Sequence, residues 1–332
     1  MIGTGSAEPA VSITGLGYKV PDRVVTNDEL AKHVDTSDEW IVERTGIHER
    51  RMAAPEEALS DLALPAARQA LEHAGVRGED VDLVIVATVT PDMAFPSTAA
   101  LIASQLGAGE AGAYDLSAGC TGFMYAIAQA YGMLAGGLAA RALVVGGDIL
   151  SRLLDWDDRS TLVLFGDGAG AVVMERVPER GFLGFELGAD GAGGTSLWLP
   201  GSGSRLFTEP ERYVKMNGRE VFKFATRILV QSAEALLAQC GASMDDVDLY
   251  IPHQANVRII DHATRKLGVP SERVVINVDR YGNTSSGSIP LALADAAADG
   301  RLQPGRLVLM TGMGAGLTWG SALMRWTKEM AA

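Results

Sequence analysis

An internal repeat is the feature that most constrains the fold. The segment 71–83 (LEHAGVRGEDVDL) lines up with the segment 237–249 (LAQCGASMDDVDL), a shift of 166 residues from position 71 to position 237. Self-similarity over such a distance indicates two related structural units that are to be interpreted together. We therefore predict one pseudo-symmetric fold of two halves, at residues 1–177 and 178–332.

Helix-like and strand-like segments alternate along the first half. Near-continuous apolar strands that alternate with amphipathic helices indicate parallel sheets covered by helices on both faces. A stretch rich in Gly, Ser, Pro and charge, 193–218, is predicted to be a long loop. The predicted helices are 61–73, 97–106 and 121–135, and the predicted strands are 81–89, 113–117 and 142–147.

Charge and cysteine content exclude several classes of protein. The net charge of −13 argues against nucleic-acid binding and against an anionic membrane surface, because both need a basic field. An acidic partner would need a local basic patch. Two cysteines make no disulfide framework, and no signal peptide or transmembrane run is evident. These features predict a cytoplasmic protein, where a thiol stays reduced.

Three polar residues follow apolar runs, where α/β proteins build their sites. Cys120 lies in DLSAGCTGF, His253 follows a strand predicted over 247–251, and Asn283 lies in GNTSSGS. A cysteine attacks as thiolate, which a helix N-terminus and a neighbouring histidine both favour. Asparagine and neutral histidine can donate hydrogen bonds to an oxygen that acquires negative charge. Together the three settings predict a covalent cysteine enzyme.

Each of these residues also has a structural interpretation. A free cysteine is more often a buried core residue, and Asn followed by Thr after Gly is common in turns. Small residues on both sides of Cys120 favour a site, because they leave the backbone free to approach a ligand. The 166-residue shift carries Cys120 onto Ser286, next to Asn283, so a two-fold axis can bring both loops to one centre. Cys240, in a helical stretch of Ala and Leu, fits the core better.

Metal and dinucleotide sites are poorly supported. None of the five histidines stands at ligand spacing from Cys, Asp or Glu, so no metal is expected. The runs GDGAG at Gly166 and GMGAG at Gly312 lack the full spacing of a dinucleotide fingerprint. We interpret them as tight backbone crossings, the second of them a candidate wall of the site.

The chain resembles the β-ketoacyl-acyl-carrier-protein synthase III family, the condensing enzymes that start type II fatty acid synthesis. This resemblance implies the thiolase fold: an α/β protein with two pseudo-symmetric mixed-sheet halves in five layers, α-β-α-β-α, which forms a homodimer. It runs from about Ile13 to Trp326 and rests on motifs that begin at Asp35 (DTSDEWI), Glu43 (ERTGI), Ser117 (SAGCTG), Phe165 (FGDGAGA), His253 (HQAN), Gly282 (GNTS) and Gly316 (GLTWGSAL).

The resemblance also implies roles for individual residues. Cys120 would be the acylated nucleophile, and His253 and Asn283 would complete a triad. The segment that follows the histidine matches the part assigned to the acyl carrier protein, with a basic patch beside it. Coenzyme A would be gripped by Trp40, Arg44 and Arg159, through stacking and phosphate pairing. The remaining implied sites are an oxyanion loop (Gly314, Ala315, Gly316 with the Cys120 amide) and the carrier surface (Gln254, Ala255, Asn256, Val257, Arg258, Lys223, Arg265, Lys266).

Two positions bear on the acyl pocket. Met313 stands where many members have Phe, so we expect a looser pocket beside the nucleophile. Phe95 matches a position at the far end of the pocket, across the dimer interface, where a bulky ring favours short primers.

The implied reaction is decarboxylative condensation of a short acyl-CoA, most simply acetyl-CoA, with malonyl-acyl carrier protein. No cofactor is expected, because acyl-CoA is a substrate. Other interpretations remain open: a condensing enzyme or acyltransferase that handles a starter unit in polyketide metabolism, an inactive carrier-binding subunit, and a Cys–His hydrolase. A degradative thiolase would need a second catalytic cysteine, for which Cys240 is badly placed.

Overall fold

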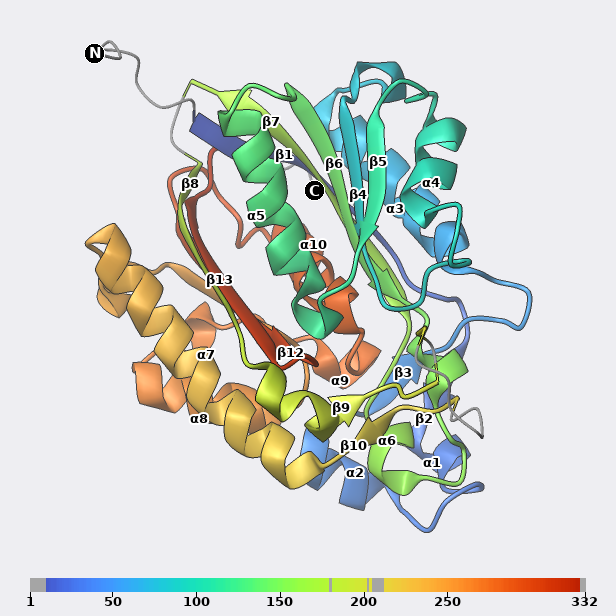
Figure 1. Ribbon diagram of the computed structural model, residues 1–332. Coiled ribbons are helices and arrows are strands. Elements are labelled where there is room, and N and C mark those ends of the chain that lie inside the picture. The colour runs from blue at the N-terminus through green and yellow to red at the C-terminus, as the bar shows by residue number, and fades with distance from the viewer. Residues whose placement is uncertain (1–9, 179–180, 202, 205–211, 329–332) are drawn as a thin grey trace.

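Two β-sheets form the framework of the protein (Figure 1). The computed structural model describes residues 10–178, 181–201, 203–204 and 212–328. The first sheet has the order β1-β7-β6-β4-β5 and the second has the order β8-β13-β12-β11. Their strands are β1 (Ala10–Lys19), β4 (Leu83–Ala87), β5 (Gly112–Leu116), β6 (Arg141–Asp148), β7 (Gly168–Val177), β8 (Phe182–Ala189), β11 (Leu249–Pro252), β12 (Leu307–Gly314) and β13 (Thr318–Arg325).

The two sheets have matching strand orders. β4 and β11 begin at Leu83 and Leu249, and β6 and β12 begin at Arg141 and Leu307. Both pairs differ by the 166 residues of the sequence repeat, so β8-β13-β12-β11 repeats β1-β7-β6-β4. The counterpart of β5 is reduced to an isolated parallel bridge between Tyr250 and Val274. All strands of the first sheet end by Val177, and β8 is the first strand of the second sheet.

The expectation of parallel sheets holds only for part of each sheet. β4 pairs in parallel with β5 and β6, and β11 pairs in parallel with β12. β7 is antiparallel to both β6 and β1, and β13 is antiparallel to both β12 and β8. An apolar strand buried on both faces has the same composition in either direction, so composition could not reveal this difference.

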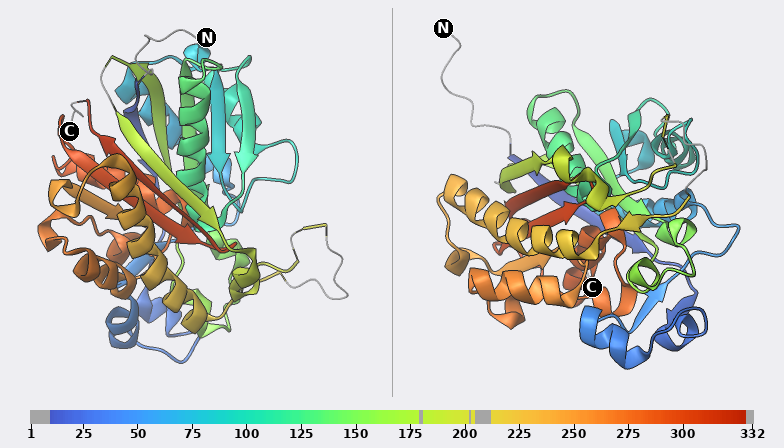
Figure 2. Two further views of the ribbon diagram at one scale, coloured as in Figure 1. Left: turned by 60° about the vertical axis from the view of Figure 1, so that its left-hand side comes forward. Right: turned by 60° about the horizontal axis from the view of Figure 1, so that its bottom comes forward.

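Helices cover the sheets in layers (Figure 1). α3 and α4 lie outside the first sheet, α5 and α10 lie between the sheets, and α7 and α8 lie outside the second. The two further views in Figure 2 agree with this five-layered arrangement. Among the helices of the described residues, none is long and apolar enough to cross a bilayer. The layer helices are α3 (Leu59–Ala74), α4 (Thr98–Leu106), α5 (Gly122–Ala135), α7 (Gly218–Cys240), α8 (Val257–Leu267) and α10 (Ser288–Ala298).

Alternating side chains of the central strands explain this layering. In β4, Leu83, Ile85 and Ala87 pack into the cluster between the sheets, whereas Val84 and Val86 pack against α3 and α4. Because successive side chains point to opposite faces, a strand covered on both sides must be apolar throughout. The cluster between the sheets joins residues of α5 and α10 to both sheets, so the two halves share one core.

A smaller group of elements lies at one end of the molecule, where the short helices that follow β1 approach the segments 197–198 and 215–216 (Figure 2). The predicted loop over 193–218 contains short elements, and its residues 202 and 205–211 lie outside the described residues. The elements of this group are β2 (Val24–Thr26), α1 (Asn27–Leu30), α2 (Asp38–Thr45), β3 (Glu49–Arg51), α6 (Arg159–Leu162), β9 (Leu197–Trp198), β10 (Lys215–Met216) and α9 (Val278–Tyr281).

Candidate active site

Two equivalent turns meet between the halves. Cys120 lies in a 3-10 turn, Gly119–Thr121, that leads from β5 into α5. Ser286 lies in the matching turn, Ser285–Gly287, that leads into α10. The turns lie against each other: a Cβ added at Gly122 would be 3.5 Å from the Cβ of Ser286. The repeat therefore carries Cys120 and the Asn283 loop to the same centre.

His253 follows the last residue of β11. Its backbone N–H donates to the carbonyl of Thr311 on β12 (2.7 Å), which continues the parallel pairing and fixes the start of the side chain. The residue is 1% exposed, and the Nδ1 of its ring lies 2.6 Å from the hydroxyl of Ser288. Burial lowers the pKa of His253 to about 4, so the imidazole is neutral at physiological pH.

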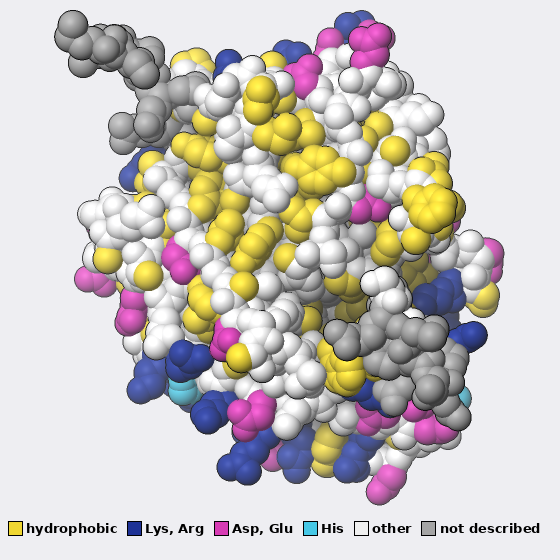
Figure 3. All heavy atoms as spheres, in the orientation of Figure 1, with side chains coloured by type: hydrophobic (Ala, Val, Ile, Leu, Met, Phe, Trp, Pro, Cys, Tyr) yellow, Lys and Arg dark blue, Asp and Glu magenta, His cyan; other side chains and the backbone are white. Residues whose placement is uncertain are grey.

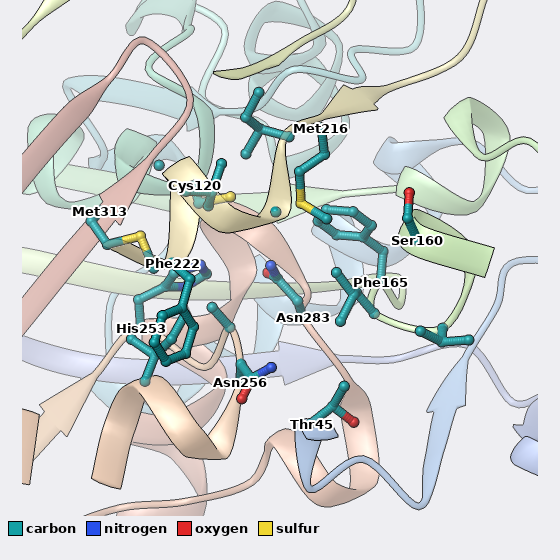
Figure 4. Close-up of a pocket in the computed structure, with 18 of the residues that line it drawn as sticks. Thr45, Cys120, Ser160, Phe165, Met216, Phe222, His253, Asn256, Asn283 and Met313 are labelled. Atoms are coloured by element: carbon teal, nitrogen blue, oxygen red, sulfur yellow. The ribbon is translucent and has the colours of Figure 1, made fainter. Parts of the chain in front are cut away.

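Asn283 is held by backbone pairing with the segment that precedes β7. Its N–H donates to the carbonyl of Leu164 (2.9 Å), and its carbonyl accepts from Gly166 (3.0 Å). The side-chain Oδ1 accepts from the backbone N–H of Ser285 (2.9 Å), a residue with a φ of 53°. This bond uses the carboxamide oxygen as acceptor, and the carboxamide of Asn283 is directed toward the side where Cys120 lies (Figure 4). Asn283 therefore offers an N–H donor.

Cys120 is buried, with 7% of its surface exposed. Burial raises its pKa, a hydrogen bond with Ser285 acts in the opposite direction, and the carboxylate of Asp148 adds a smaller upward effect, with a net value of about 11. The resting form at neutral pH is therefore the thiol. His253 is neutral at this pH, so it supplies no positive charge that would stabilise a resting thiolate.

The predicted oxyanion loop lies directly against the nucleophile. A Cβ added at Gly314 would be 2.7 Å from the backbone N of Cys120 and 2.9 Å from its Cβ. The hydroxyl of Thr318 lies 3.1 Å from the carbonyl of Ala118 and 2.8 Å from that of Ala315, so it links the loop to the Cys120 turn. Only glycine at position 314 permits this approach.

One cavity of about 330 Å3 joins the triad to the predicted coenzyme A residues. The guanidinium carbons of Arg44 and Arg159 each lie 4.7 Å from the ring centroid of Trp40. Arg159 also donates to the carbonyl of Asp35 (2.6 Å). Predicted site residues that line this cavity are Trp40, Arg44, Cys120, Arg159, His253, Ala255, Asn256, Asn283, Met313 and Gly314; part of this set is drawn in Figure 4.

A second cavity of about 260 Å3 also reaches Cys120. It shares Cys120, Phe165 and Leu197 with the first cavity, and its other walls are mostly apolar. The sequence carried no signal for it, since its walls come from eight separate segments between residues 89 and 315. These walls include Val89, Leu150, Leu153, Trp198, Leu199 and Val214.

The two residues predicted for the acyl pocket lie at different places in the structure. Met313 is buried beside Phe224 and Leu317 and lines the first cavity, not the second. Phe95 is 86% exposed and lines neither of these two cavities of its own chain. Cys240 is partly buried on α7 and is also outside both cavities.

The segment after His253 is only partly accessible. The side chain of Gln254 is fully buried: its Nε2 donates to the carbonyls of Pro252 (2.8 Å) and Val275 (3.0 Å), and its Oε1 accepts from Asn277 (2.9 Å). Gln254 therefore holds the histidine loop and is not available to a partner, which corrects its predicted place on the carrier surface. Ala255 is also buried.

The basic residues predicted for the carrier surface are exposed on α7 and α8. Lys223, Arg258, Arg265 and Lys266 all lie at the surface, and Arg258 lies 5.8 Å from the ring of Phe222. Lysine and arginine side chains gather along the lower edge of the face in Figure 3, where Figure 1 has the ends of α7, α8 and α2. Asn256 caps α8 through its Oδ1 and donates from Nδ2 to the carbonyl of Arg44 (3.1 Å).

Sequence reasoning missed three polar residues that support the triad. Ser285 bonds to the thiol, and Ser288 contacts the histidine ring. Asp148 is fully buried at the end of β6 and accepts from the hydroxyls of Thr88 (2.8 Å) and Ser286 (2.9 Å). The sequence did contain a signal for Asp148, because this polar residue directly follows the apolar strand predicted over 142–147. Ser285 and Ser288 lie in a run of similar residues, which gave no means to choose among them.

Comparisons with known proteins identify the family of the chain. The model of the 3-oxoacyl-[acyl-carrier-protein] synthase III family matches residues 114–191, and the model of the C-terminal part of the same family matches residues 237–326. A β-ketoacyl-[acyl-carrier-protein] synthase III of Symbiobacterium thermophilum is 54% identical over 323 residues, which cover 95% of this chain and 98% of that protein.

Solved structures are similar over the same extent. The β-ketoacyl-[acyl carrier protein] synthase III of Thermus thermophilus has a TM-score of 0.91 at 50% identity and covers 95% of this chain and 99% of its own. The priming β-ketosynthase of the R1128 polyketide pathway has a TM-score of 0.91 at 37% identity, with coverage of 98% and 99%. With its thiolase-like fold and near full-length similarity, the chain belongs to the β-ketoacyl-[acyl-carrier-protein] synthase III family of condensing acyltransferases.

Proposed function

We propose that this enzyme condenses a short acyl-CoA with malonyl-acyl carrier protein to form a 3-oxoacyl-acyl carrier protein, the first condensation of type II fatty acid synthesis. One observation carries the proposal: Cys120, His253 and Asn283 line a single cavity together with Trp40 and two arginines. A thiol and two neutral hydrogen-bond groups suit covalent transfer followed by stabilisation of an anion. The reaction needs no metal or bound cofactor.

The first step transfers the acyl group. The sulfur of Cys120 attacks the thioester carbonyl, whose oxygen receives hydrogen bonds from the backbone amides of Cys120 and the 314–316 loop. The carbon–sulfur bond to coenzyme A breaks, and the thiol proton ends on the coenzyme A sulfur. Since burial holds the pKa of the free thiol at about 11, the thiolate forms only during attack, where the start of α5 favours it.

The second step forms the carbon–carbon bond. Malonyl-acyl carrier protein loses carbon dioxide, which leaves an enolate whose oxygen accepts from His253 and Asn283. The enolate carbon attacks the acyl group on Cys120, and the carbon–sulfur bond to Cys120 breaks. No base has to remove a proton from the donor, because decarboxylation creates the carbanion. A neutral histidine, kept so by burial, is suited to this donor role.

The second cavity supports a place for the primer. It begins at Cys120, has largely apolar walls and lies away from Trp40, so an acyl chain on the sulfur can extend into it while coenzyme A leaves through the first cavity. A second candidate function uses the same steps with a starter unit of a specialised pathway. The similarity to the priming β-ketosynthase of a polyketide pathway favours keeping that alternative.

A homodimer would complete this second cavity. β5 is an edge strand of the first sheet, and edge strands readily pair with another chain. The loop that carries Phe95 is tied to β5, because the Asp115 carboxylate accepts from the backbone N–H groups of Thr98 and Ala99 (2.8 Å each). Pairing of two copies along β5 would cover the exposed ring of Phe95 and direct it to the second cavity of the partner subunit. Sedimentation of the wild type and of Phe95→Ala tests the dimer, and primer preference tests the role of the ring.

The carrier protein would dock on the exposed part of α7 and α8. Arg258, Lys223, Arg265 and Lys266 supply positive charge in a chain whose net charge is −13. Charge of this kind mainly speeds association and weakens with salt. All of these substrates would be met in the cytoplasm, the compartment that we propose for the enzyme.

Intact mass spectrometry tests the proposed function. The enzyme is incubated with acetyl-CoA and then with malonyl-acyl carrier protein, with Cys120→Ser as control. We expect an acetyl adduct on Cys120 that disappears as acetoacetyl-carrier protein forms. An adduct only with a longer or branched acyl-CoA would favour the specialised alternative. Hydrolysis without condensation would indicate a hydrolase, and no adduct with any acyl-CoA would refute an active condensing enzyme.

A further inference from the structure

Ser288 is the hydrogen-bond partner of the His253 ring. It is the first residue of α10, is 1% exposed, and its Oγ lies 2.6 Å from Nδ1 of His253. A second group reaches the same oxygen: the backbone N–H of Gln254 donates to Oγ at 3.4 Å. The proposed mechanism so far asks nothing of this serine.

The two contacts determine which way the hydroxyl proton points. If His253 carried its proton on Nδ1, the serine oxygen would accept from both Nδ1 and Gln254. The hydroxyl proton would then have no acceptor among the described residues, which costs a buried group about 1–3 kcal/mol. If the hydroxyl donates to Nδ1 instead, every one of these groups is paired. The second arrangement is therefore favoured.

The proton on a neutral imidazole must then be on the other nitrogen. Burial keeps His253 neutral, so its ring has a single N–H. With Nδ1 as acceptor, that N–H is at Nε2. His253 lines the same cavity as Cys120 and Asn283, and among the described residues no hydrogen bond to Nε2 competes for this proton.

We propose that Ser288 is a positioning residue that holds neutral His253 in the Nε2–H tautomer, so that its single N–H is aimed at the substrate oxygen in the cavity. The value of this tautomer for catalysis rests on the proposed function. An Nε2–H histidine donates beside Asn283 to an enolate oxygen, but it has no lone pair there to take the proton of Cys120. Ser288 thereby makes His253 a donor in condensation and not a base for the thiol.

Histidine 15N labelling and NMR of the full enzyme test the tautomer directly. His253 is assigned among the five histidines by the signals that His253→Asn removes. We expect the wild type at neutral pH to show a protonated Nε2 and an unprotonated Nδ1 with a strong hydrogen bond. A protonated Nδ1, or an imidazolium, would overturn the proposal.

Variants separate positioning from folding. In Ser288→Ala we expect the Nδ1 signal to lose its hydrogen-bond shift and the tautomers to mix, with condensation about tenfold slower, as for one lost hydrogen bond, and with acyl transfer to Cys120 unchanged. Ser288→Thr, which keeps the hydroxyl, should restore both readouts. Ser286→Ala is the matched control, because that buried hydroxyl bonds to Asp148 and the Ala87 carbonyl and not to His253.

The outcomes distinguish this inference from the proposed function. If Ser288→Ala keeps the wild-type spectrum and condenses at the wild-type rate, Ser288 does not hold the tautomer. If the wild type shows the Nε2–H tautomer but forms no acyl-enzyme, the positioning stands and the condensing function fails. If Ser286→Ala changes the His253 signals as much as Ser288→Ala does, the effect comes from the turn as a whole and the proposal is wrong.

Discussion

Replacement of Gly314 by alanine is the sharpest test of the oxyanion loop. The new Cβ would lie 2.7 Å from the Cys120 backbone N and 2.9 Å from its Cβ, whereas ordinary contacts begin at 3.4 Å. The loop and the Cys120 turn must therefore separate by about 0.7 Å to relieve the closer contact. Misplacement of reacting groups by about 1 Å can cost roughly 100-fold in rate. We expect acyl transfer to Cys120 to slow by roughly 30- to 100-fold in Gly314→Ala.

The assay is the single-turnover rate of Cys120 acylation, followed by intact mass, with circular dichroism to verify the fold. Gly132→Ala is the matched control. Gly132 is exposed in α5, and a Cβ there meets nothing within 4 Å, so this variant should keep the wild-type rate and gain about 0.5–1 kcal/mol of stability. Acylation of Gly314→Ala within threefold of the wild-type rate would show that the site does not depend on this close approach.

Three further predictions address the triad and the cavity mouth. Asn283→Ala should retain acyl transfer to Cys120 but slow condensation about 100-fold, as for one oxyanion donor; wild-type condensation by that variant would refute the role. Trp40→Ala should raise the KM for acyl-CoA roughly 5- to 30-fold, the effect of losing about 1–2 kcal/mol of stacking. The KM for an acyl donor that lacks the adenine nucleotide should not change, and an equal rise for both donors would exclude adenine stacking. The pKa of His253 is about 6.5 in the unfolded chain and about 4 in the folded protein. Between these two values protons bind mainly to the unfolded chain, so the stability present above pH 6.5 is lost as the pH falls toward 4. Between pH 7 and 5 the wild type should lose about 2 kcal/mol more of its unfolding free energy than His253→Asn, measured by denaturant titration; parallel pH curves would mean that the histidine is not buried.

Much of the fold was predictable because its signals are local or repeated. The amphipathic pattern at 61–73 lies within α3, and the apolar run at 81–89 contains β4, because alternating burial on two faces leaves its trace in composition. The 166-residue repeat survives as matching strand orders. Strand direction was not predictable in the same way: β7 and β13 run antiparallel to their neighbours, and an apolar strand has no directional signature.

The pattern of residues along the chain was enough to predict a duplicated α/β fold and to choose Cys120 and His253, which follow strands. Asn283 follows the helix α9 and not a strand, and it was the 166-residue repeat that placed it opposite Cys120. Properties that depend on distant neighbours emerged only when the chain was folded. Burial makes the Cys120 pKa high and the His253 pKa low, and it removes Gln254 from the surface. The cavity beyond Cys120 and the contact between Ser288 and the imidazole likewise join segments far apart in the sequence. A residue's charge state and accessibility are set by the atoms packed around it, and those atoms belong to other parts of the chain.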